Sequence, residues 1–255
     1  MSLTLGELRR YRSVESNRAM TLLLDKPMVF LGDTFHTNQP TQGALVELFG
    51  RIASHRLHPV TCLELNKIEL GMMQRLVTKS FHHMQQHVPA VVSFENYLGV
   101  DLKGCFRQMQ EHVPDLSPGN FVTILSGMFT CYSARRLNVR MLPVDYDDKN
   151  DVIETSKRRL ARDREVAQTI RRRVYARPCL VKYGTAHLQR YGLRSFFPDD
   201  QQACVFVFGG WRELLHCTLY TYAHAFQGYS FTAPHQRRLP ELLYLGRERQ
   251  FLKLS

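Results

Sequence analysis

Short apolar runs and longer stretches of helical periodicity alternate along most of this chain. Runs typical of buried strands occur at 28–31, 60–63, 139–144, 179–183 and 203–208. Apolar side chains recur at helical spacing over 40–55, 67–87 and 119–137. Strands joined through a crossover helix pair in parallel, with a right-handed connection. The pattern therefore predicts an α/β domain with a mainly parallel central sheet flanked by helices.

The chain is expected to form one domain, because no linker, repeat or low-complexity segment divides it. It is divided into a helical lead-in, a core and an aromatic C-terminal extension, at 1–26, 27–210 and 211–255. One amphipathic helix is predicted over 4–24. Within the core, 88–118 predicts loops and short helices that could cap a site, with a short strand at 91–94.

Composition narrows the class of protein. The chain is 44% hydrophobic and 22% charged, which is typical of a soluble globular protein. No apolar run approaches the roughly 20 residues of a membrane-spanning helix, and the N-terminal segment lacks the apolar core of a signal peptide. The six scattered cysteines form no Cys-x-x-Cys pair, so free, buried thiols are expected. Together these features predict a protein that folds in the cytoplasm.

The formal net charge is +11, and part of it is concentrated on a helix predicted over 147–176. The basic residues of this helix are Lys157, Arg158, Arg159, Arg162, Arg164, Arg171, Arg172 and Arg173. They form either a solvated helix face or a surface that attracts an anionic membrane or an acidic protein partner. Specific nucleic-acid binding is not expected, because no nucleic-acid module or aromatic-interleaved basic motif accompanies them.

Polar side chains follow four of the predicted strands at the point where each strand ends. In strand order they are Asp33 with His36, then Glu64, Asp145 and His187. Because the carboxyl ends of parallel strands lie at one edge of a sheet, these side chains are expected to meet there. Two histidines with carboxylates either bind a divalent metal or share acid and base roles around a water molecule.

Each residue also has a structural interpretation when it is considered alone. Asp33 could brace a loop, Glu64 could cap a helix, and Asp145 could be a solvated member of an acidic turn. Their recurrence at several strand ends favours a functional site. A rival pair, His83 and His87, has the spacing of metal ligands on one helix face but lacks the glutamate of a zinc-protease motif. A solvated helix end is expected there.

Four short segments share their order and separation with motifs of a known superfamily. Val29–Asn38 is similar to a Gly-Glu-x-x-His segment, and Val60–Glu64 to a second strand that ends in glutamate. Arg162–Ala167 is similar to an Arg-Asp-x-x-Met-Ala helix, and Gly184–Leu188 to a Gly-x-x-His segment. Over residues 27–210 the chain thus resembles the erythromycin esterase and ChaN-like superfamily. That group includes TraB and Tiki metallopeptidase-like proteins and domains of bacterial toxins and effectors.

The resemblance implies a hydrolase that cleaves an ester or peptide bond of a small-molecule or peptide substrate. In such an enzyme His36 would be the general base or a metal ligand, with Glu64 as its carboxylate partner or the second ligand. His187 would be the opposing ligand or the acid. If a metal is bound, zinc, manganese or cobalt suits histidine and carboxylate ligands, with one position open for water.

The other members of the predicted site would support that chemistry. Asp33 and Asp145 would orient the reacting groups, and Arg162 would steady an oxyanion or an anionic substrate. Asp33 stands where the family has glutamate, and it is one methylene shorter. Haem is not expected, since the chain has neither an additional tyrosine motif for haem ligation nor a lipoprotein signal.

An alternative is a binding or effector module that keeps the fold without catalysis. In this interpretation the site recognises a ligand, and the basic helix docks on a membrane surface or an acidic partner. The net charge of +11 and the aspartate at position 33 favour this alternative. A secreted effector that folds in a bacterial cytoplasm before translocation would fit both the charge and the expected lack of a signal peptide.

Overall fold

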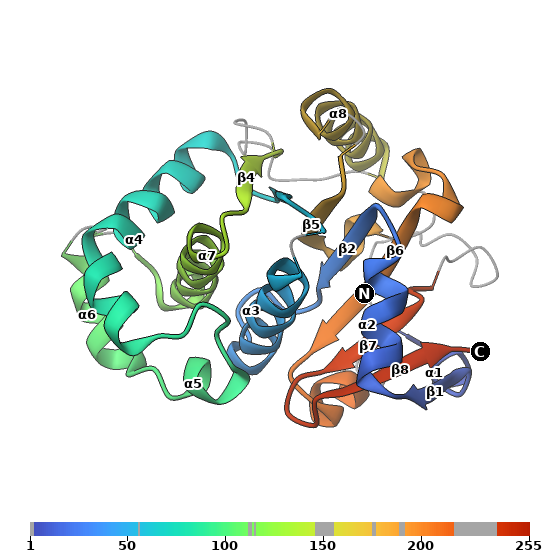
Figure 1. Ribbon diagram of the computed structural model, residues 1–255, viewed down its shortest axis with the longest axis horizontal. Helices are drawn as coiled ribbons and strands as arrows, with labels where there is room; N and C mark the ends of the chain where they lie inside the picture. Colours follow the sequence, from blue (N-terminus) through green and yellow to red (C-terminus); the bar gives the residue numbers. More distant parts are fainter. Residues whose placement is uncertain are drawn as a thin grey trace.

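The structure is a computed structural model, and it confirms the α/β fold (Figure 1). It describes residues 3–55, 57–111, 114, 116–145, 156–174, 177–188, 192–216 and 239–255. Within them, eight strands form one sheet in the order β1-β8-β7-β6-β2-β5-β3-β4. The strands are β1 (Tyr11–Val14), β2 (Met28–Asp33), β3 (Val60–Leu63), β4 (Arg140–Pro143), β5 (Cys179–Gly184), β6 (Gln202–Phe208), β7 (Leu242–Leu245) and β8 (Gln250–Leu254).

Strand β2 is central to the sheet and pairs in parallel with both β5 and β6. Strands β3 and β4 continue the parallel sheet beyond β5, and β7 continues it beyond β6. Only the outer pairings are antiparallel among the described strands, between β7 and β8 and between β8 and β1. The carboxyl ends of β2 through β7 therefore lie along one edge, as expected for a ligand site in an α/β sheet.

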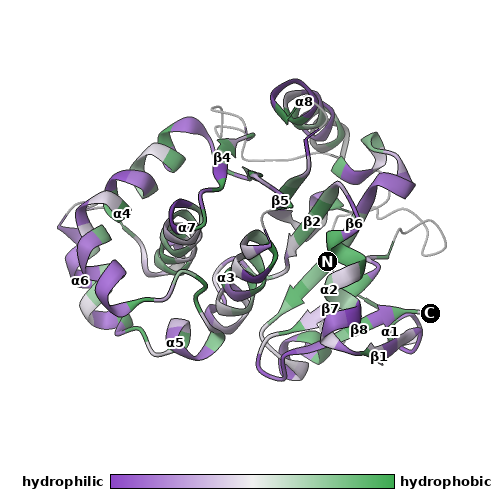
Figure 2. Ribbon diagram, in the orientation of Figure 1, coloured by the Kyte–Doolittle hydropathy of each residue, from purple (hydrophilic) through white to green (hydrophobic). Residues whose placement is uncertain are grey.

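Helices cover both faces of the sheet. On one face lie α2 (Ser16–Leu24) and α3 (Gln39–Ser54), and on the other lies α8 (Ser156–Val174). A helical layer beside α3 consists of α4 (Lys67–His87), α5 (Phe94–Leu98), α6 (Leu102–Gln110) and α7 (Pro118–Arg136). The short α1 (Leu5–Leu8) precedes β1. Figure 2 shows that hydrophobic residues predominate along the central strands, whereas the surrounding helices also carry hydrophilic residues.

Side-chain caps fix where the helices nearest the functional edge begin. Asn38 accepts a hydrogen bond from the Thr41 amide at 2.9 Å and starts α3. Asn66 and Glu69 form a capping box that starts α4 three residues after β3 ends. Ser117 caps α7, whose first residue is a proline, as is typical of a helix N-terminus. These caps place the N-termini of α3 and α4 beside the strand ends that carry the predicted site.

The single helix predicted over 4–24 is wrong, because β1 interrupts it. Tyr11 is buried, and its hydroxyl donates a hydrogen bond to the Pro240 carbonyl at 2.8 Å. Strand β1 pairs with β8, a partner about as far away in the chain as the sequence allows. Such long-range pairing overrides local helical periodicity, and nothing in the neighbouring residues signals it.

One further prediction is wrong. The strand predicted at 91–94 is absent from the described fold, because Ser93 caps α5 and the Phe94 amide donates a hydrogen bond to Glu47 at 2.6 Å. The aromatic extension, for which no strand was predicted, supplies β7 and β8. Part of the basic helix predicted over 147–176 lies outside the described residues, namely its start at 147–155 and its last two residues, 175 and 176. Residues 217–238 of the extension also lie outside them.

The remaining expectations for the chain as a whole concern thiols and membrane spans. The five cysteines within the described ranges are free, and all but Cys105 are buried, which confirms that part of the prediction. Cys217 lies outside the described residues. In the portion of the chain that the structure describes, no helix combines the length and apolar character needed to cross a bilayer.

Gly32 provides a test of the packing at the centre of the sheet. A Cβ at this position would overlap the Phe206 ring and lie 2.8 Å from Thr185 Cγ2. Gly32→Ala should therefore lower the free energy of unfolding by about 1–3 kcal/mol through overpacking, as measured by urea denaturation. Gly71→Ala is the control, because a Cβ at this helical glycine would meet only the Arg75 guanidinium, at an ordinary 3.6 Å, and alanine there should stabilise α4 by roughly 0.5–1 kcal/mol. Equal stability of both variants and the wild type would contradict this account of the packing.

Candidate functional site

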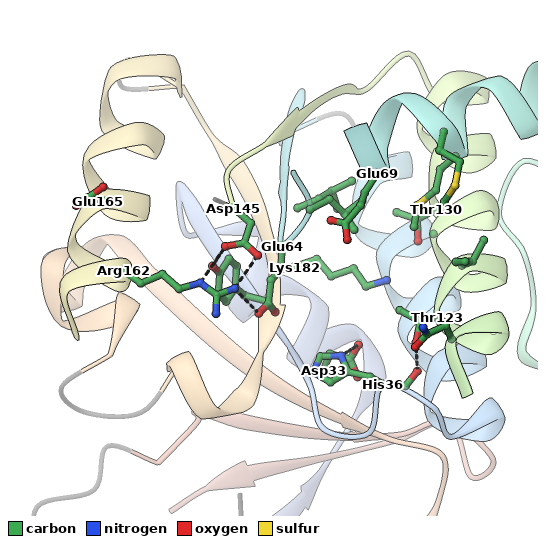
Figure 3. A pocket seen from close by; sticks show the side chains of 18 of the residues that line it. Asp33, His36, Glu64, Glu69, Thr123, Thr130, Asp145, Arg162, Glu165 and Lys182 are labelled. Atoms are coloured by element: carbon green, nitrogen blue, oxygen red, sulfur yellow. Dashed lines mark hydrogen bonds and ion pairs between the residues drawn. The ribbon is translucent and has the colours of Figure 1, made fainter. Parts of the chain in front are cut away.

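A pocket of about 1020 Å³ opens at the carboxyl edge of the sheet. Strand ends supply one wall, and α4, α7 and α8 supply the others (Figure 3). Five of the six predicted site residues line this pocket, namely Asp33, His36, Glu64, Asp145 and Arg162. These residues come from the ends of three strands and from one helix. This agrees with the expectation that the parallel strands bring them together at one edge of the sheet. The sixth predicted residue, His187, lies beside the pocket and is 6% exposed.

Asp33 and His36 form a hydrogen-bonded pair at the end of β2. His36 Nδ1 lies 3.0 Å from Asp33 Oδ2, and the His36 side chain is 55% exposed to the pocket side. The Gln42 amide from α3 donates to both Asp33 oxygens, at 2.8 and 2.9 Å, and to the Phe35 carbonyl at 3.1 Å. Thr123 of α7 donates to the His36 carbonyl at 2.8 Å. The pair is thus fixed by helices on either side of the loop that carries it.

Electrostatics favour a charged Asp33 and a basic His36. Burial alone would raise the pKa of Asp33, but its hydrogen bond and ion pair with His36 hold that pKa below the usual value. The hydrogen bond with Asp33 raises the pKa of His36, and this effect exceeds the opposing effect of burial. When His36 is neutral, the Asp33 carboxylate keeps the proton on Nδ1 and leaves the Nε2 lone pair free to accept another proton.

Glu64 follows β3 directly and is held by the backbone of β5. Its amide donates to the Lys182 carbonyl at 3.1 Å, and its Oε2 accepts the Gly184 amide at 2.5 Å. Its other oxygen, Oε1, lies 3.6 Å from Arg162 Nη2 and 3.8 Å from His187 Nε2. Burial raises the pKa of Glu64, although interactions with His187, the Gly184 amide and Arg162 oppose the increase. Glu64 therefore binds a proton more readily than an exposed glutamate does.

His36 and Glu64 converge beside Gly184. The point where a Cβ of residue 184 would lie is 3.1 Å from Glu64 Oε2 and 3.3 Å from His36 Nε2. A base and a carboxyl group thus face the same small volume. Glycine keeps that volume free of a side chain, which gives a physical reason for this residue at the end of β5.

Asp145 and Arg162 form the second ionic pair of the pocket. Arg162 reaches from α8 and donates to both Asp145 oxygens, at 2.9 and 2.6 Å. Tyr183 adds a longer hydrogen bond to Asp145, at 3.4 Å. The bidentate geometry fixes the guanidinium plane, and Figure 3 shows Arg162 directed from α8 toward Asp145 and Glu64. One positive charge is therefore held beside the Glu64 carboxyl group.

His187 supports the site from behind Glu64. Its Nδ1 lies 2.7 Å from Asp163 Oδ1, and its ring packs edge-on against Tyr183 with the ring centroids 5.1 Å apart. Since Asp163 is buried, it fixes the ring with Nε2 directed to the Glu64 side. His187 therefore lies close to Glu64, a pocket residue, but does not itself line the pocket.

The donor set does not fit a three-ligand metal site. Within the described ranges, no three histidine, cysteine, aspartate or glutamate side chains are grouped so that they could hold an ion. Of the predicted ligands His36, Glu64 and His187, only the first two share a volume, and the Arg162 guanidinium lies beside the Glu64 oxygen that faces His187. Metal binding by these residues stays a sequence-based prediction.

Sequence reasoning missed three residues that shape the site, namely Gln42, Asp163 and Lys182. Lys182 could have been predicted as a functional residue, because it lies in the otherwise apolar strand Cys179–Gly184 and a charge in such a place is costly without a partner. Asp163 was part of the quoted Arg162–Ala167 motif, but no role was assigned to it. Gln42 had no signal in the sequence, since its importance depends on the side of α3 that meets Asp33.

The rival histidine pair lies away from this pocket. His83 and His87 are both exposed on α4, with their ring centroids 4.5 Å apart. Neither residue lines the pocket. The expected solvated helix end is therefore confirmed by their exposure.

No protein-family model and no curated protein matches this chain. Among solved structures, the type III effector HopBA1 is similar, with 16% sequence identity and a TM-score of 0.44. The similarity covers 76% of this chain and 84% of that chain.

The Asp33–His36 pair predicts a pH titration that can be measured directly. His36 should titrate above its ordinary value of about 6.5, and Asp33→Asn should lower its pKa by removing the carboxylate. Because the folded chain holds this proton more tightly, the pair stabilises the fold below about pH 6.5. That contribution is lost as the pH rises through the folded-state pKa of His36.

NMR of the imidazole carbon-bound protons gives the measurement. Asp25→Asn is the control, because Asp25 is an exposed aspartate at the end of α2. The His36 titration should be unchanged in that variant. An unchanged His36 pKa in Asp33→Asn would show that the hydrogen bond does not govern it.

Proposed function

We propose that this protein is a hydrolase that cleaves an acyl bond, an ester or a peptide, in the pocket at the carboxyl edge of the sheet. The observation that carries the proposal is the convergence of His36 Nε2 and Glu64 Oε2 beside Gly184. A base and a proton donor that face one volume are what water attack on a carbonyl requires. The superfamily resemblance over residues 27–210 supports the same class of reaction.

In the proposed mechanism His36 accepts a proton from water at Nε2. Asp33 holds the imidazole in the required tautomer and stabilises the imidazolium that forms. The water oxygen then adds to the carbonyl carbon, and negative charge develops on the carbonyl oxygen. Arg162, fixed by Asp145, supplies positive charge on this side of the pocket.

Glu64 would complete the reaction as the proton donor to the leaving group. Burial raises its pKa, so the protonated form persists to higher pH than in an exposed glutamate. The Gly184 amide fixes the carboxyl group, and His187 limits its movement from behind. His187 is thus a positioning residue in this mechanism rather than a residue that touches the substrate.

The pocket wall indicates what kind of substrate would fit. Met72 and Met73 of α4, Ile124 of α7 and Leu65 also line the pocket and give it apolar surface. A cavity of about 1020 Å³ accommodates a small molecule or a short peptide segment. We infer a substrate with an apolar portion next to the bond that is cleaved.

Substitution of the two converging groups tests the hydrolase. His36→Ala and Glu64→Gln should each lower kcat/KM by roughly 100-fold or more on a panel of nitrophenyl esters and fluorogenic peptides. Gly184→Ala should also block turnover, because its methyl group would lie between the two side chains. His83→Ala is the matched control, since His83 is exposed on α4.

Circular dichroism and thermal unfolding of each variant separate lost chemistry from lost structure. Wild-type turnover by folded His36→Ala and Glu64→Gln would contradict the mechanism. Absence of turnover by the wild type across the whole panel would contradict the proposed class of substrate.

A second proposal follows from the surface of α8. Arg164, Arg171, Arg172 and Arg173 are all exposed along this helix. In this alternative the chain is a binding module, of the kind a secreted effector would use, and α8 contacts an anionic membrane surface. The free cysteines support folding in a reducing cytoplasm before any such export.

Vesicle binding tests this second proposal. Arg164→Glu/Arg172→Glu should weaken binding to phosphatidylserine vesicles, and wild-type binding should fall steeply as salt rises because screening shortens the range of the charges. Arg18→Glu/Arg107→Glu is the control, as it makes the same change in net charge at exposed positions on α2 and α6. Co-sedimentation that is equal for both double variants would contradict a role for α8.

A further inference from the structure

Lys182 places an amino group inside the pocket from the middle of an apolar sheet. It lies on β5, opposite Leu31 of β2 on one side and Leu63 of β3 on the other. Both leucines are almost completely buried. Figure 3 shows the Lys182 side chain extending from β5 across the pocket toward α7, the helix that carries Thr123 and Thr130. The long side chain thus crosses an apolar region before its amino group meets the cavity.

Few interactions would offset the energetic cost of a positive charge on the Lys182 amino group. In the part of the chain that the structure describes, its hydrogen-bond partner is Ser126 Oγ at 3.3 Å, and no carboxylate forms an ion pair with it. The nearest acids are already engaged, since Asp33 pairs with His36 and Gln42 while Glu64 accepts the Gly184 amide. An ammonium that is half-buried among apolar residues and lacks a close counter-ion is costly, so the neutral amine is favoured.

We propose that the Lys182 amine forms an imine with an aldehyde or ketone that enters the pocket, which makes the pocket a covalent carbonyl-binding site. The proposal goes beyond hydrolysis and does not depend on it. The class of ligand is a carbonyl compound with an apolar portion, because Met72 and Ile124 line the same cavity. A neutral amine in apolar surroundings is the usual form of a lysine nucleophile in proteins.

The bond changes are those of ordinary imine formation. The nitrogen lone pair of Lys182 attacks the carbonyl carbon, a C–N bond forms and the C–O π bond opens. A proton moves from nitrogen to oxygen and gives a carbinolamine. The hydroxyl group then leaves as water after it takes a proton from solvent in the open pocket, and a C=N bond remains with its nitrogen protonated. No oxidant or reductant takes part.

The electrostatic surroundings agree with this chemistry. Burial lowers the pKa of Lys182, and the carboxyl groups of Asp33 and Glu64 oppose that decrease without cancelling it. His36 is a further titratable group of the pocket wall that interacts with Lys182. The amine should therefore be neutral, and reactive, at a lower pH than an exposed lysine.

Reductive trapping in the folded wild-type protein tests the proposal. Butanal and sodium cyanoborohydride at neutral pH would convert each imine into a stable butyl-lysine, which peptide mass spectrometry locates. Lys182 should be modified severalfold faster than Lys67, an exposed lysine at the start of α4 near the same pocket. The rate at Lys182 should also reach its plateau at lower pH than the rate at Lys67.

Two controls make the outcome decisive. In denaturant the preference for Lys182 should disappear, because it depends on the folded pocket. Lys182→Met, which removes the primary amine and keeps an unbranched, uncharged side chain, should lose the rapid phase, whereas Lys67→Met should retain it. Modification of Lys67 in the folded wild type while Lys182 stays unmodified, or equal rates at both residues, would overturn the proposal. Neither result depends on whether the protein hydrolyses esters or peptides.

Discussion

A buried carboxylate at the end of the central strand determines the arrangement of the site. Asp33 is 5% exposed, and a charge in such a place requires close partners. Gln42 of α3 and His36 of the loop after β2 are the side chains that hydrogen-bond the Asp33 carboxylate. The position of α3 and the orientation of the imidazole are therefore consequences of a single solvation requirement. This requirement also gives the shorter aspartate a role suited to its length, since His36 and Gln42 hold its carboxylate close to the end of β2.

The alternation of side chains along β5 divides the site into two environments. Lys182 faces the α7 side, where leucines surround it and a neutral amine is favoured. Tyr183, the next residue, faces the α8 side and contacts Asp145 and His187. Gly184 then leaves room for Glu64 and His36 at the strand end. Three consecutive residues thus supply an amine, a support for the ionic pairs and an open volume.

The strands and helices of the parallel core were predictable because their signals are local. Apolar runs at β2, β3 and β5 and helical periodicity at α3, α4 and α7 persist over enough residues to identify the elements. The same periodicity argument failed at β1, whose partner is more than two hundred residues away in the chain. The positions of Asp33, Glu64 and Asp145 at the ends of predicted parallel strands were also enough to predict that they lie together. The side on which His187 lies could not be predicted, because it depends on the contact with Asp163.

The pairing of β1 with β8 has a consequence for synthesis on the ribosome. Tyr11 lies opposite Leu254, and Val14 lies opposite Phe251. The central strands β2, β3 and β5 can assemble as soon as residues 28–184 have left the exit tunnel. The β1 segment, although it emerges first, has no partner until residues 250–254 follow. The edge of the sheet is consequently completed only after translation has passed those residues, and until then β1 is an exposed segment on which chaperones could act.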